Sequence, residues 1–210
     1  MKLLLILNGI KERNYSKDFF QSYDKIICID GGYSNLKDLN LDIKPDLIIG
    51  DFDSIKEIED LNSFSNECKI FKDNQDETDI EFAIKILLSK YNNINELDMI
   101  YCISNDRIDH LLGNILILKR IPNSIKAKII TKSQTIYYLK NNIEINDKKG
   151  KTLSIIPMTD VEKIKSEGLK WKLDSINLNF GFVGGISNIV EENNAKISLD
   201  KGECAIIIEN

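Results

Sequence analysis

Up to about residue 130, short apolar runs alternate with segments whose apolar residues have helical spacing, and this alternation most constrains the fold. The runs are rich in Ile and Leu and lack period-two polarity, so each predicts a strand buried on both faces. Helices are expected between the strands, at 33–39, 76–91 and 107–121. Because strands that alternate with helices pair in parallel, this half predicts a Rossmann-like α/β domain. The expected strands are 2–7, 25–29, 46–50, 68–72, 97–103 and 127–131.

From about residue 133 the pattern changes to strands of alternating polarity, separated by turns rich in Gly, Asn and Asp. Several such strands at short spacing predict an all-β sandwich. We therefore expect two domains, an α/β domain at 1–132 and a β-sandwich domain at 133–210. The strand-like runs of the second part include 169–173 and 176–182, whereas 159–169 has room for a turn of helix.

Charge and composition exclude several classes of protein. The net charge of −5 argues against a general nucleic-acid binder, and an anionic substrate would need local cations. The apolar run at 2–7 is too short to cross a membrane, so no membrane association is expected. The four cysteines form no CxxC pair and His110 is the only histidine, which favours a reduced, cytoplasmic protein without a zinc site.

Four of the expected strands of the first half are followed by turns that contain acids, and ligands of parallel sheets bind beyond these strand ends. Each turn alone is ordinary, since Asp is common in turns and at helix N-termini. Together the acids would meet at one edge of the sheet and would repel one another without a cation. The turns contain Asp30, Asp51 with Asp53, Asp76 with Asp79, and Arg107 with Asp109.

These residue types suit a magnesium–nucleotide site. Mg²⁺ prefers carboxylate oxygens together with substrate phosphates. Gly31 and Gly32 would let the backbone approach a phosphate, and Arg107 could place its fork of donors on phosphate oxygens. His110, at a predicted helix start, is more often a structural residue than a ligand.

The second domain offers one large aromatic side chain and two short polar ones. Trp171 is either a core residue or, if exposed, a surface on which a flat or cationic ring can stack. Ser187 and Asn188 supply the short polar groups that orient a small ligand.

Six motifs, in order across about residues 28–190, resemble those of the thiamine pyrophosphokinase family. The resemblance implies transfer of a diphosphoryl group from ATP to thiamine, giving thiamine diphosphate and AMP, with Mg²⁺. It also implies a homodimer with thiamine sites between subunits. The motifs are DGG (30–32), PDLIIGDFDSI (45–55), DETD (76–79), RIDH (107–110), GLKW (168–171) and GISN (185–188).

The resemblance also implies roles for individual residues. Asp109 is a candidate acceptor of the thiamine hydroxyl proton. Trp171 would stack on thiamine, and Ser187 and Asn188 would bond its pyrimidine end. The implied metal ligands are Asp51, Asp53 and Asp79. The candidates for the nucleotide and diphosphate cleft are Asp30, Gly31, Gly32, Gln75, Asp76, Thr78, Arg107, Asp109 and His110.

The chain departs from the family pattern at three places. Asn105-Asp106 stands where Gly-Gly is usual. Around 182–184, where Ser together with Arg or Thr is expected, the chain has Phe182, Val183 and Gly184. Ile189 stands where an acid is frequent. These departures leave two alternatives open. One is a kinase or pyrophosphokinase for another small alcohol, and the other is a non-catalytic protein that binds a nucleotide or thiamine phosphate.

Overall fold

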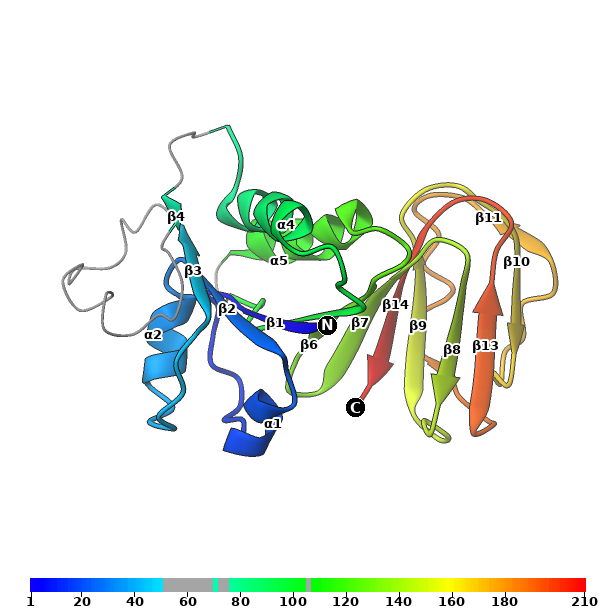
Figure 1. The fold of residues 1–210 in the computed structure, drawn as a ribbon. Coiled ribbons are helices and arrows are strands. Elements are labelled where there is room, and N and C mark those ends of the chain that lie inside the picture. The colour runs from blue at the N-terminus through cyan, green and yellow to red at the C-terminus, as the bar shows by residue number, and fades with distance from the viewer. Residues whose placement is uncertain (51–69, 72–75, 105–106) are drawn as a thin grey trace. The chain divides into compact units, whose positions relative to one another are not determined.

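The computed structural model describes residues 1–50, 70–71, 76–104 and 107–210. The chain forms two compact units, Met1–Thr131 and Lys132–Asn210. The first is an α/β unit and the second contains strands and loops (Figure 1). The predicted fold class, a parallel α/β domain followed by a β sandwich, is therefore confirmed. No helix among the described residues is long and apolar enough to cross a membrane.

The described strands of the first unit form a parallel sheet in the order β6-β5-β1-β2-β3-β4. The chain places β2, β3 and β4 on one side of β1, then β5 and β6 on the other. This reversal of strand order makes a crevice beyond the carboxyl end of β1, where ligands bind in such sheets. The strands are β1 (Lys2–Ile6), β2 (Lys25–Ile29), β3 (Leu47–Gly50), β4 (Ile70–Phe71), β5 (Glu96–Ile100) and β6 (Lys126–Ile130).

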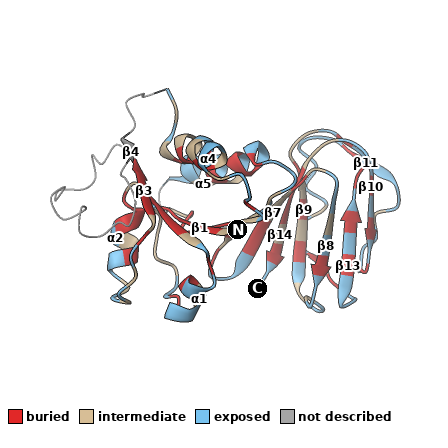
Figure 2. Cartoon of the chain, in the orientation of Figure 1, coloured by how far each residue is buried: buried red, intermediate tan, exposed pale blue. Residues whose placement is uncertain are grey.

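Helices cover both faces of this sheet, with α1 (Lys17–Gln21) and α2 (Gly32–Lys37) on one face and α4 (Asp79–Lys90) and α5 (Ile108–Ile117) on the other (Figure 1). Consecutive residues of the central strands are therefore buried: Leu3, Leu4, Leu5 and Ile6 are each fully inaccessible to solvent (Figure 2). The continuous apolar runs of the sequence thus predicted two-sided burial correctly.

Helix α1 was not predicted, because five residues are too few for a helical pattern to be visible in the sequence. Its first turn is capped by Ser16, whose hydroxyl accepts a hydrogen bond from the backbone N–H of Phe19 at 3.4 Å. Phe20 is buried, and the rings of Tyr15 and Phe19 stack with centroids 4.2 Å apart. Tertiary contacts between aromatic rings, and not local propensity, stabilise this short helix.

The second unit is a sandwich of two antiparallel sheets, with the strand orders β12-β9-β14-β7 and β11-β10-β13-β8. Side chains alternate between core and solvent as expected; in β13, for example, Ala195 and Ile197 are buried and their neighbours are exposed. The strands are β7 (Gln134–Leu139), β8 (Asn142–Asn146), β9 (Thr152–Pro157), β10 (Val161–Glu167), β11 (Ile176–Leu178), β12 (Asn188–Ile189), β13 (Asn194–Ser198) and β14 (Cys204–Glu209).

Two local predictions in the second unit were wrong. Residues 159–169 contain strand β10 and no helical turn, because the buried Val161 and Ile164 pack in the sandwich core. Residues 169–173 form no regular strand, since their contact with the neighbouring segment is an isolated bridge from Leu169 to Val190 and a bond from Lys170 N to the Ile189 carbonyl at 2.9 Å. The expected strand at 176–182 is limited to β11.

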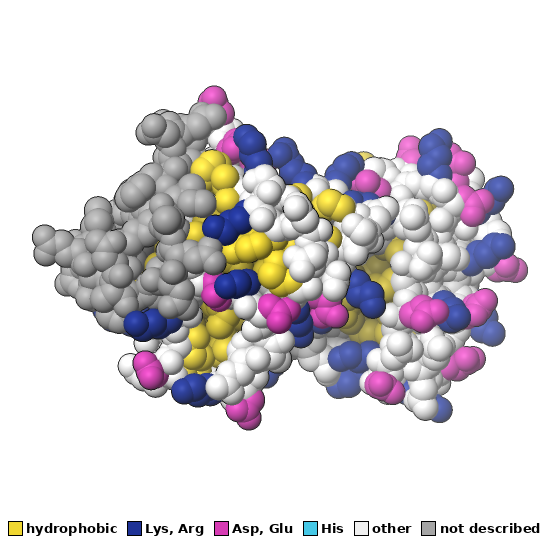
Figure 3. Space-filling view, viewed as in Figure 1, with side chains coloured by type: hydrophobic (Ala, Val, Ile, Leu, Met, Phe, Trp, Pro, Cys, Tyr) yellow, Lys and Arg dark blue, Asp and Glu magenta, His cyan; other side chains and the backbone are white. Residues whose placement is uncertain are grey.

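Charged side chains of both signs are mixed over the described surface on the face drawn in Figure 3, where Lys and Arg lie among Asp and Glu. Nucleic-acid binders instead gather basic side chains into a patch or stripe. The mixture on this face agrees with the modest net charge of −5.

Candidate functional site

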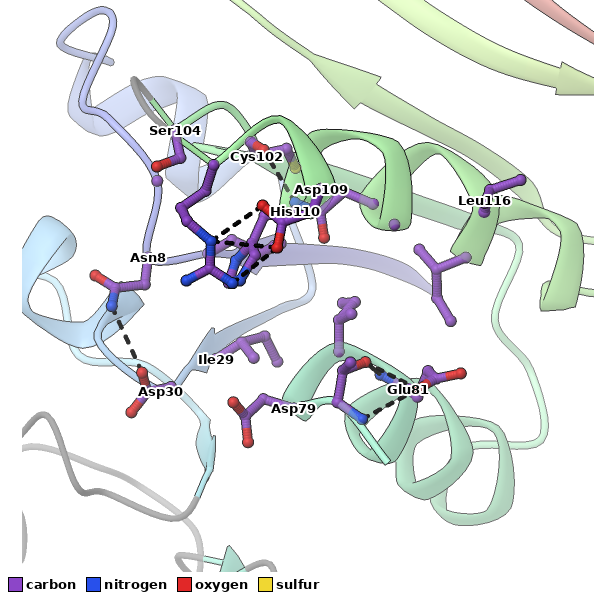
Figure 4. Close-up of a pocket in the computed structure, with 18 of the residues that line it drawn as sticks. Asn8, Ile29, Asp30, Asp79, Glu81, Cys102, Ser104, Asp109, His110 and Leu116 are labelled. Carbon is purple, nitrogen blue, oxygen red and sulfur yellow. Dashed lines mark hydrogen bonds and ion pairs between the residues drawn. The ribbon is translucent and has the colours of Figure 1, made fainter. Parts of the chain in front are cut away.

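A cavity of about 830 Å³ opens in the first unit beyond the carboxyl ends of β1, β2 and β5 (Figure 4). Residues that follow these strands form part of its wall, and the first turn of α4, helix α5 and the turn after α5 form the rest. The cavity lies at the reversal of strand order and has the volume of a site for a small molecule. It is therefore the candidate functional site of this unit.

Asp30, directly after β2, presents a carboxylate to this cavity. Its backbone has a φ of 45°, in the left-handed region, and its N–H donates to the Ile49 carbonyl at 2.7 Å. One carboxylate oxygen, Oδ2, accepts a hydrogen bond from Asn8 Nδ2 at 3.5 Å. The other, Oδ1, is buried and has no hydrogen-bond partner among the described residues. A buried carboxylate oxygen of this kind needs a donor or a cation, which a ligand can supply.

Gly31 and Gly32 follow Asp30 and begin α2. A Cβ atom at Gly31 would overlap the side chain of Asn8, and one at Gly32 would overlap the carbonyl oxygen of Ile6. Both glycines thus permit the close packing of α2 against the end of β1, independently of any ligand. Contact of their backbone with a phosphate stays a prediction.

The first turn of α4 is held by side chains on two sides. Thr78 Oγ1 accepts a bond from the Glu81 N–H at 3.3 Å, and Glu81 Oε2 accepts one from the Thr78 N–H at 3.0 Å, which is a complete capping box. The other oxygen of Glu81, Oε1, forms an ion pair at 2.9 Å with Arg120 in the short turn η1 (Leu118–Arg120) after α5. Asp79, the next residue after Thr78, lines the cavity, whereas Asp76 is exposed and lies outside the lining.

The first turn of α5 has no side-chain cap, and its N-cap residue is Arg107. The guanidinium forks onto Asp109: Nε donates to Oδ1 at 3.0 Å and Nη2 donates to Oδ2 at 2.8 Å. Both side chains are exposed and line the cavity. Hydrogen bonding to Arg107 lowers the pKa of Asp109 to about 2, so this carboxylate is a weak base at neutral pH. The arrangement favours orientation of Arg107 as the role of Asp109.

Residues from three separate segments that the sequence predicted as site residues meet at this cavity. They are Asp30, Thr78, Asp79, Arg107, Asp109 and His110. The expected metal ligands Asp51 and Asp53, and the cleft candidate Gln75, lie outside the described residues. Within the part that is described, no three His, Cys, Asp or Glu side chains are grouped to hold a metal ion.

Several lining residues were not predicted from the sequence. Asn8 follows β1, so the strand-end rule that selected the acids would also have found it. Glu81, Gly113 and Arg120 line the cavity from the helices. Their position depends on which helix face meets the cavity, and the sequence pattern alone does not give it.

In the second unit, Trp171 is 55% exposed and so is not a core residue. Its backbone is fixed by the buried side chain of Asn188: Oδ1 accepts from Trp171 N at 3.1 Å, and Nδ2 donates to the Trp171 carbonyl at 2.7 Å. Asn188 Oδ1 also accepts from Ile189 N at 2.8 Å, so both lone pairs of this oxygen are used. Lys170 Nζ lies 4.9 Å from the centroid of the Trp171 ring.

Ser187 is exposed, has a φ of 64°, and donates its N–H to Ser154 Oγ at 3.1 Å. The structure thus brings Trp171 and Asn188 into direct contact within the second unit. The positions of these residues relative to a ligand stay predictions.

Each of the two units matches a known family model. A family model described as the catalytic domain of thiamin pyrophosphokinase matches residues 16–131, and one described as its vitamin B1 binding domain matches residues 140–204. Thiamine pyrophosphokinase of Bacillus subtilis (strain 168) is 30% identical over 183 residues, covering 84% of this chain and 83% of the relative. Thiamine pyrophosphokinase 1 of Oryza sativa subsp. japonica is 27% identical over 198 residues, covering 83% and 75%.

Solved structures agree with this assignment. The crystal structure of Bacillus subtilis thiamine pyrophosphokinase superimposes with a TM-score of 0.84 at 25% identity, covering 100% of this chain and 99% of that one. A thiamin pyrophosphokinase family protein from Enterococcus faecalis gives a TM-score of 0.85 at 22% identity, with coverage of 100% and 99%, and supports the fold. One family model covers more than half of the chain, and the strand-end acids Asp30 and Asp79 of the chain meet at one cavity. The chain therefore belongs to the thiamine pyrophosphokinase family.

Proposed function

We propose that this chain transfers a diphosphoryl group from ATP to the hydroxyl group of thiamine, giving thiamine diphosphate and AMP. The observation that carries the proposal is the meeting of Asp30, Asp79 and Arg107 at one cavity of the first unit. In this proposal the α/β domain, 1–132, binds ATP and Mg²⁺, and the β sandwich, 133–210, binds thiamine. The matches to a catalytic domain and to a vitamin B1 binding domain support this division.

In the reaction, the thiamine hydroxyl oxygen bonds to the β-phosphorus of ATP as the bond from that phosphorus to the α–β bridging oxygen breaks. AMP leaves with the bridging oxygen, and the hydroxyl proton is released to solvent. Catalysis of such a transfer is chiefly positioning and charge stabilisation. The Arg107 guanidinium binds phosphate oxygens through the Nη hydrogens that Asp109 does not use, and Asp109 orients it. The uncapped N-terminus of α5 adds backbone donors toward the same anion.

The side chains of the cavity fit a magnesium ion. Asp30 has a buried carboxylate oxygen without a hydrogen-bond partner among the described residues, and the carboxylate of Asp79 lines the same cavity. Oxygen ligands of this type suit Mg²⁺, which neutralises phosphate charge when bound. Asp79 would hold it together with Asp51 and Asp53.

Thiamine is proposed to stack on Trp171, whose exposed ring suits a cationic thiazolium. Lys170 lies over that ring, so thiamine must displace its ammonium or use the other face. Ser187 and Asn188 are proposed to contact the pyrimidine. Because both lone pairs of Asn188 Oδ1 are used, a direct bond from Asn188 rests on its remaining amide hydrogen.

A homodimer with thiamine sites between subunits is part of the proposal. Exposed apolar side chains support an interaction surface: in α5, Ile108, Leu112 and Leu116 are spaced by four residues and are 70%, 55% and 48% exposed. A cytoplasmic location is supported by the buried free thiols of Cys28 and Cys102.

The test incubates the purified chain with ATP, Mg²⁺ and thiamine and separates products by chromatography. Equal amounts of thiamine diphosphate and AMP are expected. Asp79→Asn should lower the rate by at least about 100-fold, whereas Asp18→Asn, which changes the first-turn acid of α1, should not. ADP as product, AMP formed only with another alcohol, or nucleotide binding without turnover would each contradict the proposal.

A further inference from the structure

Gly113 lies inside helix α5, where glycine is less favourable than any residue except proline. The two usual reasons for a glycine do not apply. Its φ is not positive, unlike that of Gly150 or Gly168. A Cβ atom at Gly113 would meet no atom of the described residues within 4 Å, so packing does not exclude a side chain. Neither the backbone nor the core accounts for glycine here.

Gly113 is exposed and is one of the residues that line the cavity, so the open space beside it adjoins the cavity. Six residues separate it from Arg107, which corresponds to roughly 9 Å along the helix axis. Figure 4 shows α5 carrying Asp109 and His110 near one end of the cavity and Leu116 further along. Gly113 is therefore set back from the charged end.

Apolar side chains line the cavity near Gly113, and charged ones follow in the turn after α5. Leu116 and Ile117 line it from α5, and Ile80 lines it from α4. The polar neighbour Asn114 is buried and donates Nδ2 to the Cys102 carbonyl at 2.9 Å, so its side chain is engaged within the fold. The cavity lining thus contains an apolar stretch of α4 and α5 between two groups of charged side chains. One group is formed by the strand-end acids and Arg107, and the other by Lys119 and Arg120, with Arg120 paired to Glu81.

We propose that Gly113 is a specificity-determining residue, which leaves room for the flat base of the nucleotide between α4 and α5. This inference rests on the proposed function, in which ATP places its phosphates near Arg107. An apolar slot next to a phosphate site suits a nucleobase, because the base offers two flat faces for contact with aliphatic side chains. A side chain at position 113 would fill the slot.

The test compares Gly113→Ala and Gly113→Leu with the unchanged chain. Calorimetry gives the affinity for ATP and for inorganic tripolyphosphate, a probe that has phosphates and no base. Gly113→Leu is expected to weaken ATP binding at least about tenfold and to leave tripolyphosphate binding unchanged. Gly113→Ala is expected to raise the melting temperature by roughly 2 °C and to weaken ATP binding less.

Ser89 supplies the matched control, because it is an exposed residue of α4 outside the cavity lining. Ser89→Leu should leave ATP binding unchanged. If Gly113→Leu does not melt cooperatively, Gly113→Ala is tested with ethenoadenosine triphosphate, whose base is larger; its affinity should fall more than that of ATP.

Several results would overturn the inference. Unchanged ATP affinity in Gly113→Leu would do so, as would equal losses for ATP and tripolyphosphate, or a loss of thiamine binding alone. Failure of the unchanged chain to bind ATP would overturn both proposals. ATP binding that depends on position 113, without formation of thiamine diphosphate, would support the inference and contradict only the proposed function.

Discussion

Helices α4 and α5 both begin at the cavity, but their first turns are built in opposite ways. The start of α4 is closed by the capping box of Thr78 and Glu81 and by the ion pair from Glu81 to Arg120. The start of α5 has no side-chain cap among the described residues, and its N-cap residue, Arg107, is paired with the exposed Asp109. At α4 a side chain caps the first turn, whereas at α5 the N–H groups of His110 and Leu111 bond to the Arg107 carbonyl and no side chain of the described residues caps the turn.

This difference suggests that the first turns of α4 and α5 have different functions. The closed start of α4 fixes the position of Asp79, as its proposed role as a metal ligand requires. The open start of α5 keeps backbone N–H groups and a guanidinium available for an anion. The predictions below test this division.

The largest effect is expected from Arg107→Ala. The side chain supplies a fork of donors to phosphate at the open helix end, so kcat/KM for ATP should fall about 100-fold or more. Arg107→Lys should restore only part of the activity, because an ammonium lacks the planar fork. Steady-state kinetics provide the measurement, with Lys85→Ala, an exposed cation of α4 outside the cavity lining, as control. Equal activity of Arg107→Ala and the control would refute the assignment.

Thr78→Ala should reduce both stability and activity. Loss of the cap should lower the free energy of unfolding by about 1 kcal/mol. The rate should fall about tenfold, since Asp79 is the next residue and loses its fixed backbone. Ser16→Ala removes the cap of α1, away from the cavity, and should reduce stability without affecting the rate. Thr78→Ser should restore both quantities, and full activity in Thr78→Ala would argue against a fixed start of α4.

Asp109→Asn should lower the rate a few-fold at every pH, because Asp109 orients Arg107. Its pKa is lowered to about 2, so the carboxylate is ionised throughout pH 5–9. The ion pair therefore contributes above the usual carboxylate pKa and is lost only as the pH falls through about 2. The pH profile of kcat/KM should keep its shape in the variant; disappearance of an acid limb would identify Asp109 as the general base instead.

The smallest effect is the expected difference in melting temperature between Arg107→Ser and Arg107→Ala. Serine is a good N-cap residue, so its hydroxyl should satisfy a donor that the open end leaves unpaired. The melting temperature should exceed that of Arg107→Ala by roughly 2 °C, while activity stays as low. Thermal unfolding of the two variants without ligand makes the comparison. The absence of any gain would mean that the start of α5 is already satisfied.

Much of the fold could be predicted from the sequence because strands that are buried on both faces consist of continuous apolar residues, as in β1 and β2. Helix α1 could not, because the contact of Tyr15 with Phe19 stabilises it and no periodicity marks it. Residues 169–173 resemble a strand in composition, yet Asn188 holds Trp171 through side-chain bonds that no local pattern reveals.

The site also contains residues that could be predicted from the sequence and residues that could not. Asp30, Asp79 and Arg107 were predictable, because the carboxyl ends of parallel strands meet at one edge of the sheet. A polar residue in the turn that follows such a strand is therefore expected at the site. Gly113 and Arg120 were not, because their contribution depends on the rotation of α5 over the sheet. The packing of helix on sheet sets that rotation.

The central strand β1 has a consequence for synthesis of the chain. It pairs with β2, which follows early in the sequence, but the partner of its other edge is β5, which is made much later. In that pair Lys2 lies opposite Glu96 and Ile6 opposite Ile100. While the ribosome makes the intervening residues, this apolar strand has one unpaired edge, which is a template for association with other chains. Arg107 and the helix after it emerge later still, so a nascent chain cannot complete the cavity until nearly the whole first unit has left the ribosome.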